Sequence, residues 1–218
     1  MTATDGATLS GVVAVAPQPS RPPSAEERLL INGVTWGTYV MLREALDDQR
    51  AGVRLTYLEG ALEIMSPSDA HEAAKSLLGR LVEAYIDEQD LPIDGFGSTT
   101  FRHEAVARGL EPDESYTLGG RKPLPDLAIE VMFSAPKLDK LEVYRGLGVP
   151  EVWIWRDGQL VVHLLGTNGY KISSKSKLFP SLDVALLASF VRIDESQTAL
   201  VKRFRAALRK PRAKRSRK

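Results

Sequence analysis

The chain has 218 residues, of which 43% are hydrophobic and 26% are charged. This length and composition are typical of one globular domain with a sizeable apolar core. The sequence contains no cysteine, which excludes disulfides, cysteine nucleophiles and cysteine-ligated zinc. Its three histidines do not pair at metal-ligand spacing, so a metal site must rely on carboxylates, which favour Mg²⁺ or Mn²⁺.

The formal net charge of +1 conceals an uneven distribution of charge. Residues 209–218 hold seven Lys or Arg and no acid, which leaves 22 basic and 28 acidic residues, or about −6, in the rest of the chain. This tail, with Arg212, Lys214 and Arg215, is a candidate for binding nucleic-acid phosphates. A solubilising disordered terminus explains it equally well. Without an apolar run of roughly 18 residues or a secretory signal, we expect a cytoplasmic protein.

The first elements are predicted by local patterns. Residues 1–25 are rich in Ala, Pro, Ser and Thr without periodicity, so we expect disorder there and a domain over 26–208. A short helix is expected over 36–46. Two alternating runs around Glu59-Gly60 predict a β-hairpin.

The clearest helix signal begins at Ser66-Pro67-Ser68-Asp69. We expect Ser66 to cap the helix, Pro67 to occupy its first position and Asp69 to follow three residues after the cap. Apolar residues then recur at helical spacing as far as Ile86, and the helix is expected to stop before Pro92.

The remaining elements alternate between strands and helices, which predicts an α/β fold, with α+β as the alternative. A crossover through a helix should make the strands at 127–133 and 152–155 parallel. In order, we expect strands within 93–118 with a charged connection near Arg108-Gly109, a loop at 119–123, a strand at 127–133, a helix at 137–147 ended by Gly148, a hairpin of 152–155 and 160–165 about Asp157-Gly158, and a helix near 195–208.

Glu130 is the most anomalous residue in this pattern. Both faces of the strand at 127–133 are largely apolar, which indicates a central strand covered on both sides. A carboxylate there costs several kcal/mol unless it is paired, protonated or bound to a metal. Either a salt bridge to a nearby Arg or Lys or a metal site would stabilise the Glu130 carboxylate.

A metal would need a second carboxylate beside Glu130. Asp126 lies on the same face, but four residues of strand place it roughly 13 Å away. It is therefore expected in a turn or in support of the site. Asp113, which follows Pro112 and precedes an apparent strand, is the candidate from a neighbouring strand. An ordinary turn aspartate is the alternative reading of Asp113.

Beside the two carboxylates, Lys140 is the third candidate for a catalytic residue, and His71 and Glu59 are candidates for auxiliary roles. Lys140 borders the packed face of the following helix, where it either snorkels to solvent or steadies charge that develops on a phosphate. Lys137, one turn earlier, competes for that role. His71 at the start of the long helix and Glu59 at the hairpin tip are candidates as well, although a hydrogen-bonded buried histidine and a solvated turn glutamate explain them without a site.

The order of these motifs resembles a known family. The motifs are Tyr57-Leu58-Glu59-Gly60, Met65-Ser66-Pro67-Ser68 with His71, Gly109-Leu110-Glu111-Pro112-Asp113-Glu114, Leu124-Pro125-Asp126-Leu127-Ala128-Ile129-Glu130-Val131, Leu138-Asp139-Lys140-Leu141 with Tyr144, and Gly148-Val149-Pro150-Glu151-Val152-Trp153. From about Trp36 to Leu187 the chain resembles the putative restriction endonuclease family of bacterial proteins. This family is a branch of the PD-(D/E)XK nuclease superfamily.

The resemblance implies a restriction-endonuclease-like core, a central mixed β-sheet flanked by α-helices. It carries a metal-binding aspartate onto Asp113, with Pro125-Asp126 as a second candidate, and a metal-binding glutamate onto Glu130. The superfamily lysine would fall two positions after that glutamate, where this chain has Met132. Lys140 is the expected replacement from the next helix. Glu59 and His71 match positions that the family usually keeps.

The function implied by the resemblance is Mg²⁺- or Mn²⁺-dependent hydrolysis of phosphodiester bonds in nucleic acid, with DNA as the expected substrate. A homodimer is also expected, since nucleases of this superfamily often dimerise to cut two strands. The alternatives are an inactive nuclease-fold module that binds DNA or a protein partner, and a metal-dependent hydrolase with another substrate.

Overall fold

The computed structural model describes residues 26–48 and 52–209. Its strands are β1 (Glu27–Asn32), β2 (Arg54–Leu58), β3 (Ala61–Ser66), β4 (Ile93–Gly95), β5 (Phe101–His103), β6 (Arg108–Leu110), β7 (Glu114–Leu118), β8 (Leu127–Val131), β9 (Glu151–Arg156), β10 (Gln159–Gly166) and β11 (Gly169–Ser173). Its helices are α1 (Trp36–Asp48), α2 (Asp69–Glu88), α3 (Lys140–Leu147), α4 (Val184–Ser189) and α5 (Gln197–Leu208), with a short 3₁₀ turn η1 (Glu104–Val106). The α/β class is confirmed.

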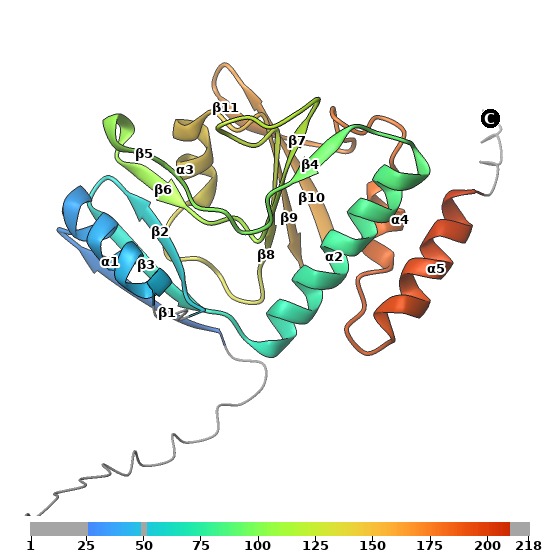
Figure 1. Ribbon diagram of the computed structural model, residues 1–218, viewed down its shortest axis with the longest axis horizontal. Helices are drawn as coiled ribbons and strands as arrows, with labels where there is room; N and C mark the ends of the chain where they lie inside the picture. The colour runs from blue at the N-terminus through green and yellow to red at the C-terminus, as the bar shows by residue number, and fades with distance from the viewer. Residues whose placement is uncertain (1–25, 49–51, 210–218) are drawn as a thin grey trace, which may run out of the picture.

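The strands form two sheets that lie side by side (Figure 1). The smaller sheet is antiparallel, with the order β1-β3-β2-β6-β5. Helix α1 covers its outer side, where Tyr39 packs with Leu55, Tyr57 and Leu62. Sequence patterns predicted the β2–β3 hairpin and α1 of this sheet, but not a separate second sheet.

The larger sheet is mixed, with the order β11-β10-β9-β8-β7-β4. Strands β8 and β9 are parallel, with Leu127 opposite Glu151, and α3 connects them. The predicted crossover is therefore confirmed, as is the β9–β10 hairpin. Parallel neighbours need such a connection because a tight turn can join only antiparallel strands.

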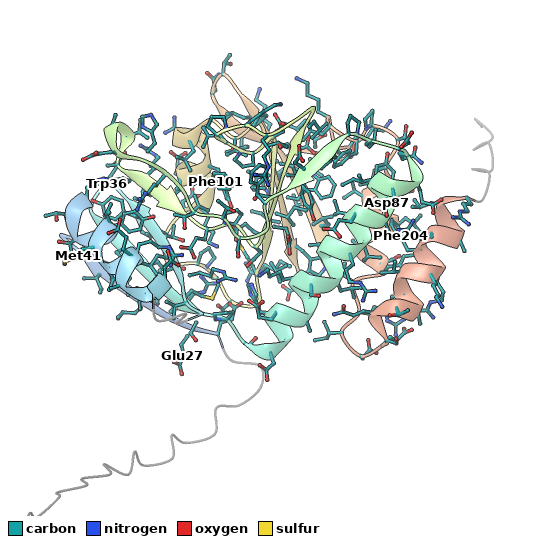
Figure 2. All side chains as sticks on the ribbon, in the orientation of Figure 1. Glu27, Trp36, Met41, Asp87, Phe101 and Phe204 are labelled. Carbon is teal, nitrogen blue, oxygen red and sulfur yellow. The ribbon has the colours of Figure 1, made fainter. Side chains whose placement is uncertain are left out.

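Helices cover both faces of the larger sheet. On one face, α2, α4 and α5 pack against Leu127, Ile129 and Val131, and the labelled Phe204 of α5 belongs to this core (Figure 2). On the other face, α3 lies between the two sheets, where Tyr144 packs with residues of both. All five residues of β8 are buried, which confirms that this strand is central.

Several boundaries differ from the sequence prediction. The cap of α2 is Ser68, whose Oγ accepts from the backbone N–H of His71, and not Ser66, which ends β3. Pairing with Glu27 of β1 keeps Ser66 extended, so the helix begins two residues later than predicted. Arg108 and Gly109 lie in β6 rather than in a connection, because they pair with both β2 and β5.

Other elements are shorter than predicted or were missed. Strand β8 ends at Val131, and α3 begins at Lys140 because Asp139 caps it. Strands β1 and β11 and the short helix α4 were not predicted. Both strands lie at sheet edges, where half-exposed residues blur the alternation of apolar and polar positions. In the part of the chain that the structure describes, no helix is long and apolar enough to cross a membrane.

Candidate functional site

Asp113 is held against the end of β8 by its own backbone and side chain. Its N–H donates to the carbonyl of Ile129 at 3.1 Å, and its Oδ2 accepts from the N–H of Val131 at 2.8 Å. The residue is 1% exposed. These two bonds bracket Glu130 in the sequence, so they bring the predicted carboxylates to the same end of one strand.

Glu130 points from β8 towards α3. Its Oε2 accepts from Lys140 Nζ at 2.6 Å, and its Oε1 accepts a short hydrogen bond from the Tyr144 hydroxyl. Lys140 and Tyr144 are four residues apart on α3, so their side chains share one face of that helix. All three side chains are buried.

The capping of α3 fixes the position of the lysine. Asp139 accepts from the N–H of Leu141 at 2.9 Å, which makes Lys140 the first helical residue. At the other end, Gly148 has a φ of 77°, a left-handed conformation that favours glycine and ends the helix. The structure thus brings Lys140 to Glu130, whereas the competing Lys137 is exposed and its backbone N–H donates to Glu63.

His71 links Asp113 to Glu26. Its Nε2 lies 2.9 Å from Asp113 Oδ1, and its Nδ1 lies 2.7 Å from Glu26 Oε1. The imidazole is completely buried. The hydrogen-bonded buried histidine expected as an alternative is what the structure shows, and one of its partners is a candidate site residue.

Glu26, Arg28 and Glu63 extend this network and were missed by the sequence analysis. Arg28 forms ion pairs with both glutamates, and its Nε donates to Ser134 Oγ at 2.8 Å. Glu63 also accepts from the N–H of Leu138 at 3.1 Å. The charged Glu63 within the apolar run Leu62–Met65 was an available signal, of the kind that identified Glu130.

Electrostatics keep this cluster highly charged. Burial disfavours the imidazolium of His71, but the hydrogen bonds and charges of Asp113 and Glu26 outweigh it and raise its pKa to about 9. Burial opposes ionisation of Asp113 as well, yet His71 and Lys140 hold its pKa below the usual value. The pKa of Lys140 is raised because Glu130 and Asp113 outweigh its burial. Lys140 is therefore protonated at neutral pH.

Burial raises the pKa of the Glu130 carboxyl, and the negative charge of Asp113 adds to this rise. The charge of Lys140 opposes both effects. Repulsion between two carboxylates is relieved by a cation near them, whether an ammonium group or a metal ion. A positive charge beside Asp113 and Glu130 therefore stabilises the two carboxylates.

A comparison with protein families identifies the chain. Residues 40–192 match the model of the Uma2 family, which is described as "Putative restriction endonuclease". The chain belongs to this family. The match covers more than two thirds of the sequence and includes Asp113, Glu130 and Lys140, so the expected family is confirmed. No curated relative matches the chain.

The Uma2 match does not extend to Glu26 or Arg28, which lie before its first residue. It does include His71 and Glu63. The charged network therefore joins residues inside the matched span to residues outside it.

The donor set suits Mg²⁺ or Mn²⁺. Among the described residues, no group of three or more histidine, aspartate and glutamate side chains is arranged to hold a metal. Mg²⁺ does not require one, because it keeps several waters and uses one or two carboxylates. Asp113 and Glu130 supply two carboxylates whose charges interact, so the residues present fit such an ion.

The structure does not bring the other predicted residues into this cluster. The Glu59 side chain is 64% exposed at the β2–β3 turn and pairs with Arg108 at 2.8 Å. Asp126 Oδ2 accepts from the N–H of Leu118 at 2.8 Å and from Lys122 at 2.7 Å, the turn role that was expected. Arg212, Lys214 and Arg215 lie outside the described residues.

Proposed function

We propose that this protein is a metal-dependent endonuclease that hydrolyses phosphodiester bonds in nucleic acid, with DNA as the substrate. The observation that carries the proposal is the convergence of Asp113, Glu130 and Lys140 in one buried cluster. The Uma2 description supports the same reaction class. In this proposal Lys140, whose Nζ lies 2.6 Å from Glu130 Oε2, takes the part of the lysine that the superfamily places on the strand.

Asp113 and Glu130 would hold Mg²⁺ or Mn²⁺ in this proposal. When bound, such an ion supplies positive charge to the scissile phosphate and makes water a better nucleophile. Lys140 is protonated, so it acts as a donor that steadies negative charge on the phosphate rather than as a base. Hydrolysis forms a bond from the water oxygen to phosphorus and breaks the bond to one ester oxygen, which leaves as an alcohol.

One observation favours a second candidate, a nuclease-fold module that binds nucleic acid or a protein without cutting. All four carboxylate oxygens of Asp113 and Glu130 accept hydrogen bonds from the protein, and both side chains are buried. A substrate must therefore gain access through movement of the surrounding chain. In an inactive module, the same contacts would serve only to stabilise the fold.

Nicking of supercoiled plasmid with Mg²⁺ or Mn²⁺ tests the proposal. Wild type, Glu130→Gln and Glu142→Gln are purified identically, and the last is a matched control because Glu142 is half-exposed on α3 and pairs with Arg145. Wild type and Glu142→Gln should nick the plasmid, whereas Glu130→Gln should lose the rate by orders of magnitude. EDTA should abolish the reaction.

Two other outcomes count against the proposal. Equal nicking by wild type and Glu130→Gln would mean that the site is elsewhere or that the activity is a contaminant. No nicking by any variant, together with no binding of Mn²⁺, would favour the inactive module. Light scattering on the same samples tests the homodimer that we propose for cutting two strands.

A further inference from the structure

The two carboxylate oxygens of Glu26 have separate partners. Oε1 bonds to His71 Nδ1 at 2.7 Å, and Oε2 accepts from the N–H of Ser134 at 3.0 Å and from Arg28 Nη2 at 3.0 Å. The side chain is completely buried, although the residue immediately precedes the edge strand β1. Glu26 thus bridges the start of α2 and the loop after β8.

The first of these contacts fixes an imidazole that itself holds Asp113. A histidine has two ring nitrogens, and the hydrogen bond at one of them determines the ring orientation and the proton position at the other. Because Glu26 binds Nδ1, Nε2 is directed at Asp113 Oδ1. A carboxylate that is oriented in this way keeps its remaining lone pairs in fixed directions.

The second contact acts on the loop that joins Glu130 to Lys140. Glu26 and Arg28 both bind Ser134, and Arg28 is held in turn by Glu63. The loop therefore has a fixed point between β8 and α3. An ion pair needed only for the stability of β1 would not require a second carboxylate oxygen bound to the histidine of α2.

We infer that Glu26 is a positioning residue for the metal site, which orients Asp113 through His71 and fixes the 132–139 loop through Ser134. The inference rests on the proposed function, since it takes Asp113 as a metal ligand. It assigns a role to a residue outside the Uma2 match. Residues that orient metal ligands in this way typically contribute about 10- to 100-fold to metal affinity.

The test measures the Kd of the full chain for Mn²⁺ by electron paramagnetic resonance. The variants are Glu26→Ala, Glu26→Gln and Glu63→Gln. Glu63 is the matched control, because it is a buried glutamate that binds the same arginine and, at Leu138, the same loop, whereas in the described structure the hydrogen-bond partners of the His71 ring are Glu26 and Asp113. Thermal unfolding of each variant establishes that it is folded.

The Kd should rise about 10- to 100-fold in Glu26→Ala. It should rise less in Glu26→Gln, whose amide oxygen still accepts a hydrogen bond, and least in Glu63→Gln. The Mn²⁺ concentration for half-maximal nicking should follow the Kd, while the rate at saturating Mn²⁺ changes less. A purely structural role would lower the unfolding temperature without this change in metal affinity.

The outcomes separate the inference from the proposed function. If wild type binds no Mn²⁺, the metal-dependent function fails and the inference falls with it. If wild type binds Mn²⁺ and the folded Glu26 variants bind it equally well, only the inference is overturned. An equal loss in Glu63→Gln would also overturn it, because the contacts that Glu63 shares with Glu26, to Arg28 and to the loop, would then explain the result without His71. Should Glu26→Ala not fold, the comparison of Glu26→Gln with Glu63→Gln decides.

Discussion

Lys140 Nζ lies 2.6 Å from Glu130 Oε2, and neither side chain is more than 6% exposed. The two residues come from different elements, since Glu130 is on β8 and Lys140 is the first residue of α3. The position two residues after Glu130 holds Met132, which is also buried. An ammonium group therefore lies beside the glutamate, although no lysine stands two positions after it.

This buried pair leads to a prediction for stability. Lys140→Met should lower the free energy of unfolding by about 3–5 kcal/mol, because it leaves Glu130 buried without a compensating charge. The double variant Glu130→Gln/Lys140→Met should be more stable than Lys140→Met alone, since it removes both charges. Urea unfolding of the four proteins in this cycle gives the coupling energy. If the free energy of unfolding lost in the double variant equals the sum of the losses in the two single variants, the two groups do not interact.

A second prediction concerns the other partner of Glu130. Tyr144→Phe removes the hydroxyl that donates to Glu130 Oε1 and preserves the ring that packs between the sheets. We expect a loss of about 1.5–3 kcal/mol, the usual contribution of a hydrogen bond to a charged group. Tyr170→Phe is a matched control, because the hydroxyl of Tyr170 donates to a neutral backbone carbonyl, that of Val149. Its loss in urea unfolding should be smaller, and a larger one would contradict the prediction.

The strand that carries Glu130 was predictable because the signals for it lie in its own short stretch of sequence. An acid within an uninterrupted apolar run must find a partner, and alternation along the strand already placed it on one face. The helix that supplies Lys140 was predictable in part, since the glycine that ends it, Gly148, is a local signal, whereas its start after Asp139 was not predicted. The sequence made Asp113 only a candidate from a neighbouring strand, which the family resemblance supported, because no local pattern specifies which strands pair.

The contribution of Glu26 was not predictable in this way. Its partners His71 and Ser134 are 45 and 108 residues away, and the residue itself borders a segment rich in Ala, Pro and Ser. Strand β1 is a half-exposed edge strand, so its hydrophobic alternation is weak. Such long-range contacts follow from the tertiary fold and leave no pattern in the neighbouring sequence.

A third prediction tests the packing of α1 on the smaller sheet. A Cβ at Gly109 would collide with the ring of Tyr39, which is fully buried and stacks on Tyr57 with centroids 4.9 Å apart. Gly109→Ala should therefore cost about 1–3 kcal/mol in the free energy of unfolding. Gly37→Ala is the control, because a Cβ on this helical glycine meets nothing within 4 Å.

Gly37→Ala should instead stabilise the protein, by up to about 1 kcal/mol, since alanine loses less backbone entropy than glycine when a helix forms. Urea unfolding of the two variants measures both changes. Equal effects of the two substitutions would mean that the contact between Tyr39 and β6 is loose.

The last prediction follows from the ionisation of Glu26. Burial opposes its charge, but hydrogen bonds from His71, Ser134 and Arg28 lower its pKa from 4.5 to about 2. Between these two values, the unfolded chain binds more protons than the folded one, so stability is lost as the pH falls. The full contribution, present above pH 4.5, corresponds to about 3 kcal/mol.

Urea unfolding of wild type and Glu26→Gln at pH 6 and pH 3.5 measures this contribution. The stability difference between the two proteins should be about 1 kcal/mol smaller at pH 3.5, because the wild type loses part of its advantage there. Glu44→Gln is the control, since this glutamate on α1 has a side chain 65% exposed and lies 3.9 Å from Arg102. Its stability should stay within about 0.5 kcal/mol of wild type at both pH values. A difference for Glu26→Gln that does not change with pH would mean that its carboxylate contributes no ionisation-dependent stability to the fold.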